Sequence, residues 1–191
     1  MITQEFTMKA ADAKSLVRRL KKFVSTDAVR EMLTGIHLFE RDDELWVEAT
    51  DSYRLIRFNL GIQAPAKMFS TIVPFKFLEA AVKTATTSVV FTFEGVVLTI
   101  DSLSLRSSCN LIQGDYPSVS RIIDDMKPLD EPITPGGFNP TYMRDLAAAL
   151  IEWTKDDAAI QIVQMHELKP LVIEMTGQHG GHAVLMPQRV H

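Results

Sequence analysis

The stretch from Thr50 to Arg54 gathers a carboxylate, two aliphatic hydroxyls, a phenol and a guanidinium within five residues. Asp51 beside Ser52 could support nucleophilic chemistry if a histidine or lysine activated the serine. Neither stands at a motif spacing, and the chain lacks GxSxG, HExxH, GxGxxG and GxxxxGK[ST] motifs. We therefore expect no enzyme. A small hydrolase that uses Ser52, Asp51 and a histidine brought close by folding is the alternative.

Other polar clusters have simpler interpretations. Residues 178–182 (QHGGH) share letters with an oxyanion loop, but no nucleophile elbow accompanies them and a hairpin turn is expected there. The acid pairs at 42–43 and 124–125 each fit a solvated turn with no third ligand nearby. The sequence therefore predicts no metal site and no cofactor.

Composition favours a globular cytoplasmic protein. Hydrophobic residues make up 46% and charged residues 23% of the chain, enough to bury a core. The apolar runs are too short to span a bilayer, and no basic-then-apolar leader follows Met1. The single cysteine, Cys109, cannot form an intrachain disulfide, which favours a reducing cytoplasm. We expect no membrane partner.

A unit of one helix and four strands recurs three times. Apolar periodicity predicts helices over 10–26, 74–86 and 139–155, so their starts lie 64 and then 65 residues apart. Asn139 is a candidate N-cap, and Pro74 and Pro140 suit helix starts. Short strand-like runs surround each helix: 5–9, 35–40, 44–50, 53–60, 68–73, 88–93, 95–101, 103–113, 133–138, 158–165, 170–175 and 181–187.

The repeat is thus βαβββ, joined by linkers at 61–67 and 126–135. An amphipathic helix beside three strands buries its apolar face by lying across a sheet. We therefore predict an α+β fold with helices on one face of antiparallel sheets.

The predicted helices concentrate positive charge in a chain whose net charge is −4. A basic helix face is most often only solvated, but this asymmetry is typical of a surface that meets DNA phosphates without reading sequence. The candidate DNA-binding residues are Lys14, Arg18, Arg19, Lys21, Lys22, Lys76, Lys83 and Arg144.

Several segments resemble the bacterial DNA polymerase sliding clamp, the β subunit of DNA polymerase III. They are LTGIHLF (33–39), ELWVEATDSYRL (44–55), VPFKFL (73–78), LIQGDYPSV (111–119), GFNPTYMRDL (137–146), LKPLVI (168–173) and VLMPQRV (184–190). His191 and Asp124 depart from the family pattern. The resemblance implies that 1–126 correspond to the family's middle domain and 127–191 to half of its last domain. The chain would then be an abbreviated clamp, with a phage origin indicated.

The family resemblance implies a processivity factor in DNA replication. Such a protein encircles double-stranded DNA and tethers DNA polymerase and clamp loader through short peptides, with antiparallel sheets outside and helices lining the ring. Carried over by motif, the peptide-binding pocket comprises Leu33, Thr50, Ser52, Tyr53, Arg54, Leu55, Asn139, Tyr142, Leu168, Pro170, Val184, Leu185, Met186, Pro187, Gln188, Arg189 and Val190. Arg54 and Arg189 would hold the polar groups of the peptide.

The number of repeats bears on assembly. Family rings contain twelve βαβββ units, so three units per chain imply a homotetramer, closed by a junction between the third unit of one copy and the first of the next. A dimer, or a non-encircling regulatory module or decoy that binds clamp partners, is the alternative.

Overall fold

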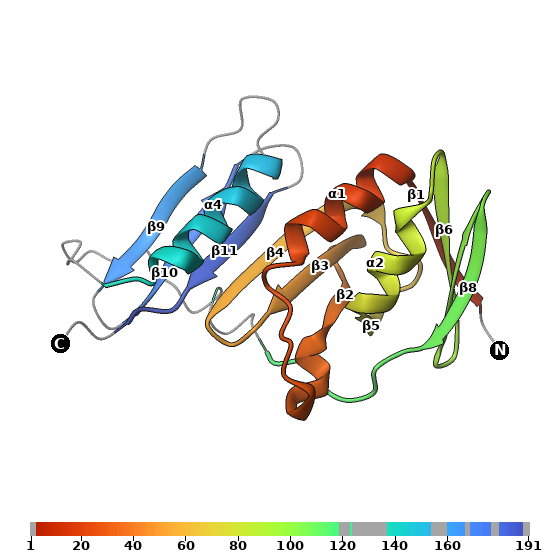
Figure 1. Cartoon of the computed structure of the whole chain (residues 1–191), viewed down its shortest axis with the longest axis horizontal. Helices are drawn as coiled ribbons and strands as arrows, with labels where there is room; N and C mark the ends of the chain where they lie inside the picture. Colours follow the sequence, from red (N-terminus) through yellow and green to blue (C-terminus); the bar gives the residue numbers. More distant parts are fainter. Residues whose placement is uncertain are drawn as a thin grey trace.

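Helices α1 (Ala10–Leu20), α2 (Phe75–Lys83) and α4 (Pro140–Trp153) lie in a row on one face of two antiparallel β-sheets (Figure 1), and α1 contacts both of the others. The computed structural model describes residues 3–118, 123, 137–153, 160–166, 169–176 and 180–188. The predicted α+β architecture, with the helices on one sheet face, is confirmed.

The strands lie close to the predicted runs. They are β1 (Thr3–Lys9), β2 (Gly35–Arg41), β3 (Glu44–Thr50), β4 (Arg54–Gln63), β5 (Ser70–Pro74), β6 (Ser88–Glu94), β7 (Val97–Ser102), β8 (Leu105–Asn110), β9 (Ile160–His166), β10 (Lys169–Met175) and β11 (Gly181–Leu185). Of the run expected at 133–138, the structure describes only the last two residues. Gly137 forms an isolated bridge with Gln188.

The first helix ends earlier than predicted. α1 stops at Leu20, a turn follows, and the 3₁₀ helix η1 (Ala28–Thr34) occupies a stretch for which no element was predicted. The turn carries Phe23 into the core, where it is fully buried. Asp27 begins η1 by accepting a hydrogen bond from the backbone N–H of Val29 at 3.0 Å.

Strand exchange joins the first two units into one body. β1 precedes α1 in sequence but pairs with β6 in the four-stranded sheet β1-β6-β7-β8. β5 precedes α2 but pairs with β2 in the seven-stranded sheet β5-β2-β3-β4-β11-β10-β9. Because each unit completes the other's sheet, neither buries its helix alone.

The third unit extends the larger sheet by antiparallel pairing of β11 with β4, from Gly181 opposite Phe58 to Leu185 opposite Arg54. The sheet is therefore continuous across the boundary predicted at residues 126 and 127, a division that stays a prediction. The first unit is thus already paired with the third within one chain. The strands β8, of the second unit, and β9, of the third, lie at opposite ends of the molecule (Figure 1). The expected junction between the third unit of one copy and the first of the next stays a prediction.

The main core lies between the helix row and the sheets. Leu20, Leu78 and Leu146, from the three helices, are almost fully buried and belong to one cluster with inward-facing strand residues such as Ile36 and Leu98. Burying a side chain of this size contributes about 1.5–3 kcal/mol. Within the part of the chain that the structure describes, no helix is both long and apolar enough to cross a membrane.

Candidate functional site

The stretch from Thr50 to Arg54 forms the tight turn between β3 and β4. Asp51 Oδ1 accepts hydrogen bonds from the backbone N–H groups of Tyr53 and Arg54, each at 3.0 Å. The Thr50 hydroxyl donates to the Arg54 carbonyl at 2.9 Å. These bonds make the polar side chains part of the turn itself.

The acid and the hydroxyl of this turn have arginine partners. Asp51 Oδ2 accepts from Arg54 Nε at 2.9 Å, and Ser52 Oγ accepts from Arg30 Nη1 at 2.7 Å. The hydrogen bonds described for these two side chains come from arginine guanidinium groups and backbone N–H groups. The arrangement supports a structural turn and gives no support to the hydrolase alternative.

Arg54 links the first unit to the third. Its Nη1 donates to Asp145 Oδ2 on α4 at 2.7 Å, and its guanidinium lies 4.5 Å from the ring centroid of Tyr142. Burial raises the pKa of Asp145, but hydrogen bonds from Arg54 and Arg144 outweigh that effect and hold it below its ordinary value. Arg54 Nε and Nη1 are thus already held by carboxylates of the chain, and the expectation that Arg54 holds a peptide's polar groups stays a prediction.

A small pocket lies where β4 and β11 meet, on the sheet face away from the helices. It encloses about 120 Å³ and is lined by Thr50, Ser52, Arg54, Leu55, Pro117, Ser118, Val184 and Met186. Leu55 and Val184 are opposite each other in the sheet, and the backbone N–H of Met186 donates to the Tyr53 carbonyl at 2.9 Å. We call this site the apolar pocket. The structure thus brings together two segments separated by about 130 residues of chain.

Two lining residues were not predicted. Pro117 and Ser118 belong to the segment after β8, whose Tyr116 stacks on His37 of β2 and accepts a hydrogen bond from the Thr50 N–H of β3. The family resemblance includes 111–119, so the sequence marked this segment as part of the family pattern. Nothing in the sequence indicated that the segment lies beside Val184.

Two predicted residues lie elsewhere. Leu185 is fully buried in the core under the helices, because adjacent residues of a strand point to opposite faces and Val184 takes the outer one. Leu33 is buried at the end of η1, where its carbonyl accepts from the Ser25 N–H at 2.8 Å, and it does not line the pocket.

The other predicted residues that the structure describes do not line the apolar pocket. Asn139 caps α4 by accepting from the Thr141 N–H at 2.9 Å, and the ring centroids of Tyr53 and Tyr142 are 6.0 Å apart. Pro170 lies in β10, and Pro187 and Gln188 follow β11 without lining the pocket. Outside the described residues lie Leu168, Arg189 and Val190.

The helix row presents most of the predicted basic residues. These residues, at exposed or half-buried positions on the helices or just after α1, are Lys14, Arg18, Lys21, Lys22, Lys76, Lys83 and Arg144. Lys21 forms a salt bridge with Glu79 on α2 at 2.7 Å. Arg19 differs, because its guanidinium lies 5.4 Å from the Phe58 ring centroid and its Nε is buried. Arg19 thus packs toward the sheet, and its predicted contact with DNA stays a prediction.

No metal centre is found among residues that the structure describes: they contain no group of three or more His, Cys, Asp or Glu side chains able to hold an ion. Asp42 and Asp43 form the β2–β3 turn with positive φ angles, as expected for turn acids. The second acid pair, at 124–125, and His179 lie outside the described residues.

Sequence comparison identifies relatives of this chain. The family described as "DNA polymerase III beta subunit, central domain" matches residues 7–118, more than half of the chain. The beta sliding clamp of Staphylococcus epidermidis is 27% identical over 130 residues, which cover 65% of this chain and 34% of that protein. The beta sliding clamp of Streptococcus pneumoniae is 28% identical over 116 residues, or 58% and 30% of the two chains. The aligned part is thus about a third of these relatives' length.

Solved structures show the same fold. The DNA polymerase III beta subunit of Thermotoga maritima superposes with a TM-score of 0.79 at 12% identity, covering 98% of this chain and 66% of that one. The DNA polymerase sliding clamp of Bacillus subtilis gives 0.75 at 18% identity, covering 98% and 64%. The fold is therefore the DNA-clamp fold, and the chain belongs to the DNA polymerase III beta subunit family, through that subunit's central domain.

Proposed function

We propose that this protein is a DNA sliding clamp, a processivity factor that encircles duplex DNA as a homo-oligomeric ring and tethers a replicative polymerase and a clamp loader. The helix row carries the proposal: exposed Lys and Arg residues lie on α4, on α2 and on or just after α1. Both sheets lie behind this row of helices (Figure 1). In a ring, that face would line the hole. A cytoplasmic location and a phage origin belong to the same proposal and stay predictions.

The charge distribution suits a mobile contact with DNA. Contacts between lysine or arginine and phosphate do not depend on base sequence and weaken with salt. Since retention by a closed ring is topological, these contacts need only be weak. The negative net charge of the whole chain disfavours DNA binding elsewhere on the surface.

The apolar pocket is the proposed binding site for the short peptide that tethers the polymerase. Leu55, Val184 and Met186 provide apolar walls, and methionine adapts to different ligand shapes. A polymerase held there by a short peptide gains a high effective concentration at the primer end. No step of this function requires chemistry, in keeping with the turn at Asp51.

Ring closure would use the two outer strands. β8 and β9 end the sheets at opposite ends of the molecule and carry exposed apolar side chains, Leu105 on β8 and Ile160 and Ile162 on β9. An unpaired strand edge is a template for pairing with another chain. Four copies, joined β8 to β9, would supply the twelve units of a family ring.

Retention on circular DNA tests the proposal. After loading onto a nicked circular plasmid, the protein should co-elute with DNA through a sizing column in high salt, and cutting the plasmid once should release it. A control plasmid cut before loading should retain none. Release that does not depend on linearisation would contradict encirclement and favour the non-encircling module that binds clamp partners.

A further inference from the structure

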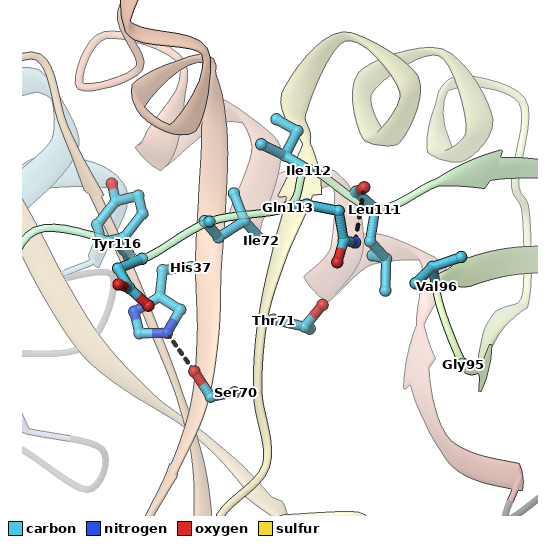
Figure 2. Close-up of a pocket in the computed structure, with 12 residues that line it drawn as sticks. His37, Ser70, Thr71, Ile72, Gly95, Val96, Leu111, Ile112, Gln113 and Tyr116 are labelled. Carbon is cyan, nitrogen blue, oxygen red and sulfur yellow. Dashed lines mark hydrogen bonds between the residues drawn. The ribbon is translucent and has the colours of Figure 1, made fainter.

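Figure 2 shows a second, polar pocket of about 350 Å³. Like the apolar pocket, it lies on the sheet face away from the helices, because Ile36 and Leu38 point into the core under the helices and His37 between them points outward. The side chains that matter here are those of His37, Ser70, Thr71, Gln113, Asp115 and Tyr116, which come from β2, β5 and the segment after β8. We call it the polar pocket. Neither the predicted pocket residues nor the apolar pocket includes any of these six.

The floor of the polar pocket is fixed by a row of cross-strand neighbours. Glu48 Oε2 forms a salt bridge with Arg57 Nη2 at 2.6 Å, and Glu48 Oε1 lies 2.7 Å from His37 Nδ1. His37 Nε2 in turn lies 2.9 Å from Ser70 Oγ. The order of serine, histidine and carboxylate resembles a nucleophilic triad, but Arg57 already neutralises the carboxylate. We therefore interpret the row as a rigid floor.

This floor leaves hydrogen-bond acceptors at the surface. The Glu48 carboxylate can only accept, so His37 Nδ1 donates to it and, in neutral His37, Nε2 accepts the Ser70 hydroxyl proton. The Ser70 oxygen then offers its lone pairs to a ligand. Asp115 is exposed, and no described residue forms a salt bridge with it. Acceptors and one carboxylate favour a cationic donor, such as a lysine or arginine side chain.

Tyr116 separates the two pockets. Its ring stacks on His37 with centroids 4.8 Å apart, and its hydroxyl accepts a hydrogen bond from the Thr50 N–H at 3.0 Å. Thr50 lines the apolar pocket, as do Pro117 and Ser118, which follow Tyr116 directly. Since an extended peptide advances about 3.3 Å per residue, a few residues suffice to cross one tyrosine side chain.

We propose that the two pockets form one continuous peptide site, in which the polar pocket binds a lysine or arginine that flanks the apolar anchor of the docking peptide. This inference rests on the proposed tethering function and adds the chemistry of the peptide's flank. Ile72 already has its carbonyl bound by the Ile112 N–H at 3.0 Å, so this part of the β5 edge is covered and recognition falls to side chains.

Selection from a peptide library tests the inference. The library fixes two alternate leucines as the anchor and varies four residues on each side. Wild-type protein should enrich lysine or arginine on one flank. Asp115→Asn, which keeps the shape and removes the charge, should retain the leucine preference and lose the basic one. Asp12→Asn, an exposed acid on α1, is the matched control and should select as wild type does.

Binding measurements then quantify the interaction between the selected lysine and Asp115. Replacing the selected lysine by glutamine should weaken binding to wild type about tenfold, as expected for one charge-assisted hydrogen bond, and change binding to Asp115→Asn little.

The possible outcomes distinguish failure of this inference from failure of the proposed tethering function. If leucine anchors are selected by wild type and lost in Met186→Ser, but no basic flank emerges, the inference is wrong and the tether stands. Selection of no peptide would overturn both. If Asp115→Asn loses the leucine preference as well, Asp115 supports the shape of the apolar pocket, which overturns the two-pocket assignment.

Discussion

Arg54 and Asp145 form a salt bridge of 2.7 Å between β4 and α4, with side chains only 12% and 9% exposed. The two residues are 91 positions apart and belong to the first and third units. The pair therefore supplements the backbone pairing of β4 with β11 in holding the third unit in place. The apolar pocket lies at this joint, so its shape depends on the salt bridge.

Asp145→Asn should destabilise the attachment of the third unit. Removing one partner leaves the other charge buried and costs roughly 3 kcal/mol. Arg54 retains Asp51, so the loss should not exceed that value. Urea unfolding followed by far-UV circular dichroism measures it. Asp12→Asn, at an exposed site, serves as the control and should change the free energy of unfolding little. Equal stability of Asp145→Asn and wild type would contradict the role of the salt bridge.

The same pair predicts a dependence on pH. Because the pKa of Asp145 is lower in the folded chain than its ordinary 3.8, its stabilising contribution is fully present above that value. It is lost as pH falls through the folded pKa. The difference in unfolding free energy between wild type and Asp145→Asn should therefore be constant near neutral pH and shrink below pH 3.8. A difference that grows on acidification would contradict the assignment.

Much of the fold follows from local patterns. β3 coincides with its predicted run, and Asn139 and Pro140 start α4 as expected, since capping and alternation are local signals. The exchange of β1 and β5 between sheets was not predictable, because alternation shows which face of a strand is buried but not which strand it pairs with. The seven residues of η1 are too few for a helical period to show.

The candidate site was likewise predicted only in part. The family resemblance correctly indicated that Leu55 and Val184 lie together, although peptide binding there stays a prediction. The strand period of two would have excluded Leu185 from the pocket. The partner of Arg54 was missed because Asp145 is distant in sequence, and only the folded chain shows that this arginine is already engaged.

Gly181 permits the close approach of β11 to β4. A Cβ there would lie 2.6 Å from the Arg57 carbonyl oxygen and 2.8 Å from Phe58 Cβ. Gly181→Ala should therefore force the strands apart, at a cost of roughly 1–3 kcal/mol, and expose the third unit to protease. Limited proteolysis with mass spectrometry detects the cut. Gly180→Asn is the control, because a Cβ at Gly180 meets nothing within 4 Å and asparagine tolerates its positive φ. Similar protection of both variants would show that the joint does not need this glycine.

The proposed contact between the helix row and DNA predicts a salt effect. Changing Lys14, Arg18 and Lys22 to glutamine should reduce the slope of log affinity against log salt by about 0.9 for each cation removed that contacts duplex phosphate. Fluorescence anisotropy with a labelled duplex over a range of salt concentrations measures the slope. Lys169→Gln on β10, away from the helix row, should leave it unchanged. An unchanged slope in the triple variant would place the DNA contact elsewhere.

The outer strand β9 predicts the basis of assembly. Ile162 is 52% exposed at this edge, so aspartate there should spare the fold while introducing an unpaired charge into a β8–β9 contact. Wild type should elute as a homotetramer, about four times the 21.4 kDa chain mass, and Ile162→Asp as a monomer, measured by size exclusion with light scattering. Val29→Asp is the matched control, because Val29 is 92% exposed on η1, away from both edges, and should leave the mass unchanged. A wild-type monomer at every concentration would contradict the ring, and an oligomer unaffected by Ile162→Asp would contradict the β8–β9 junction.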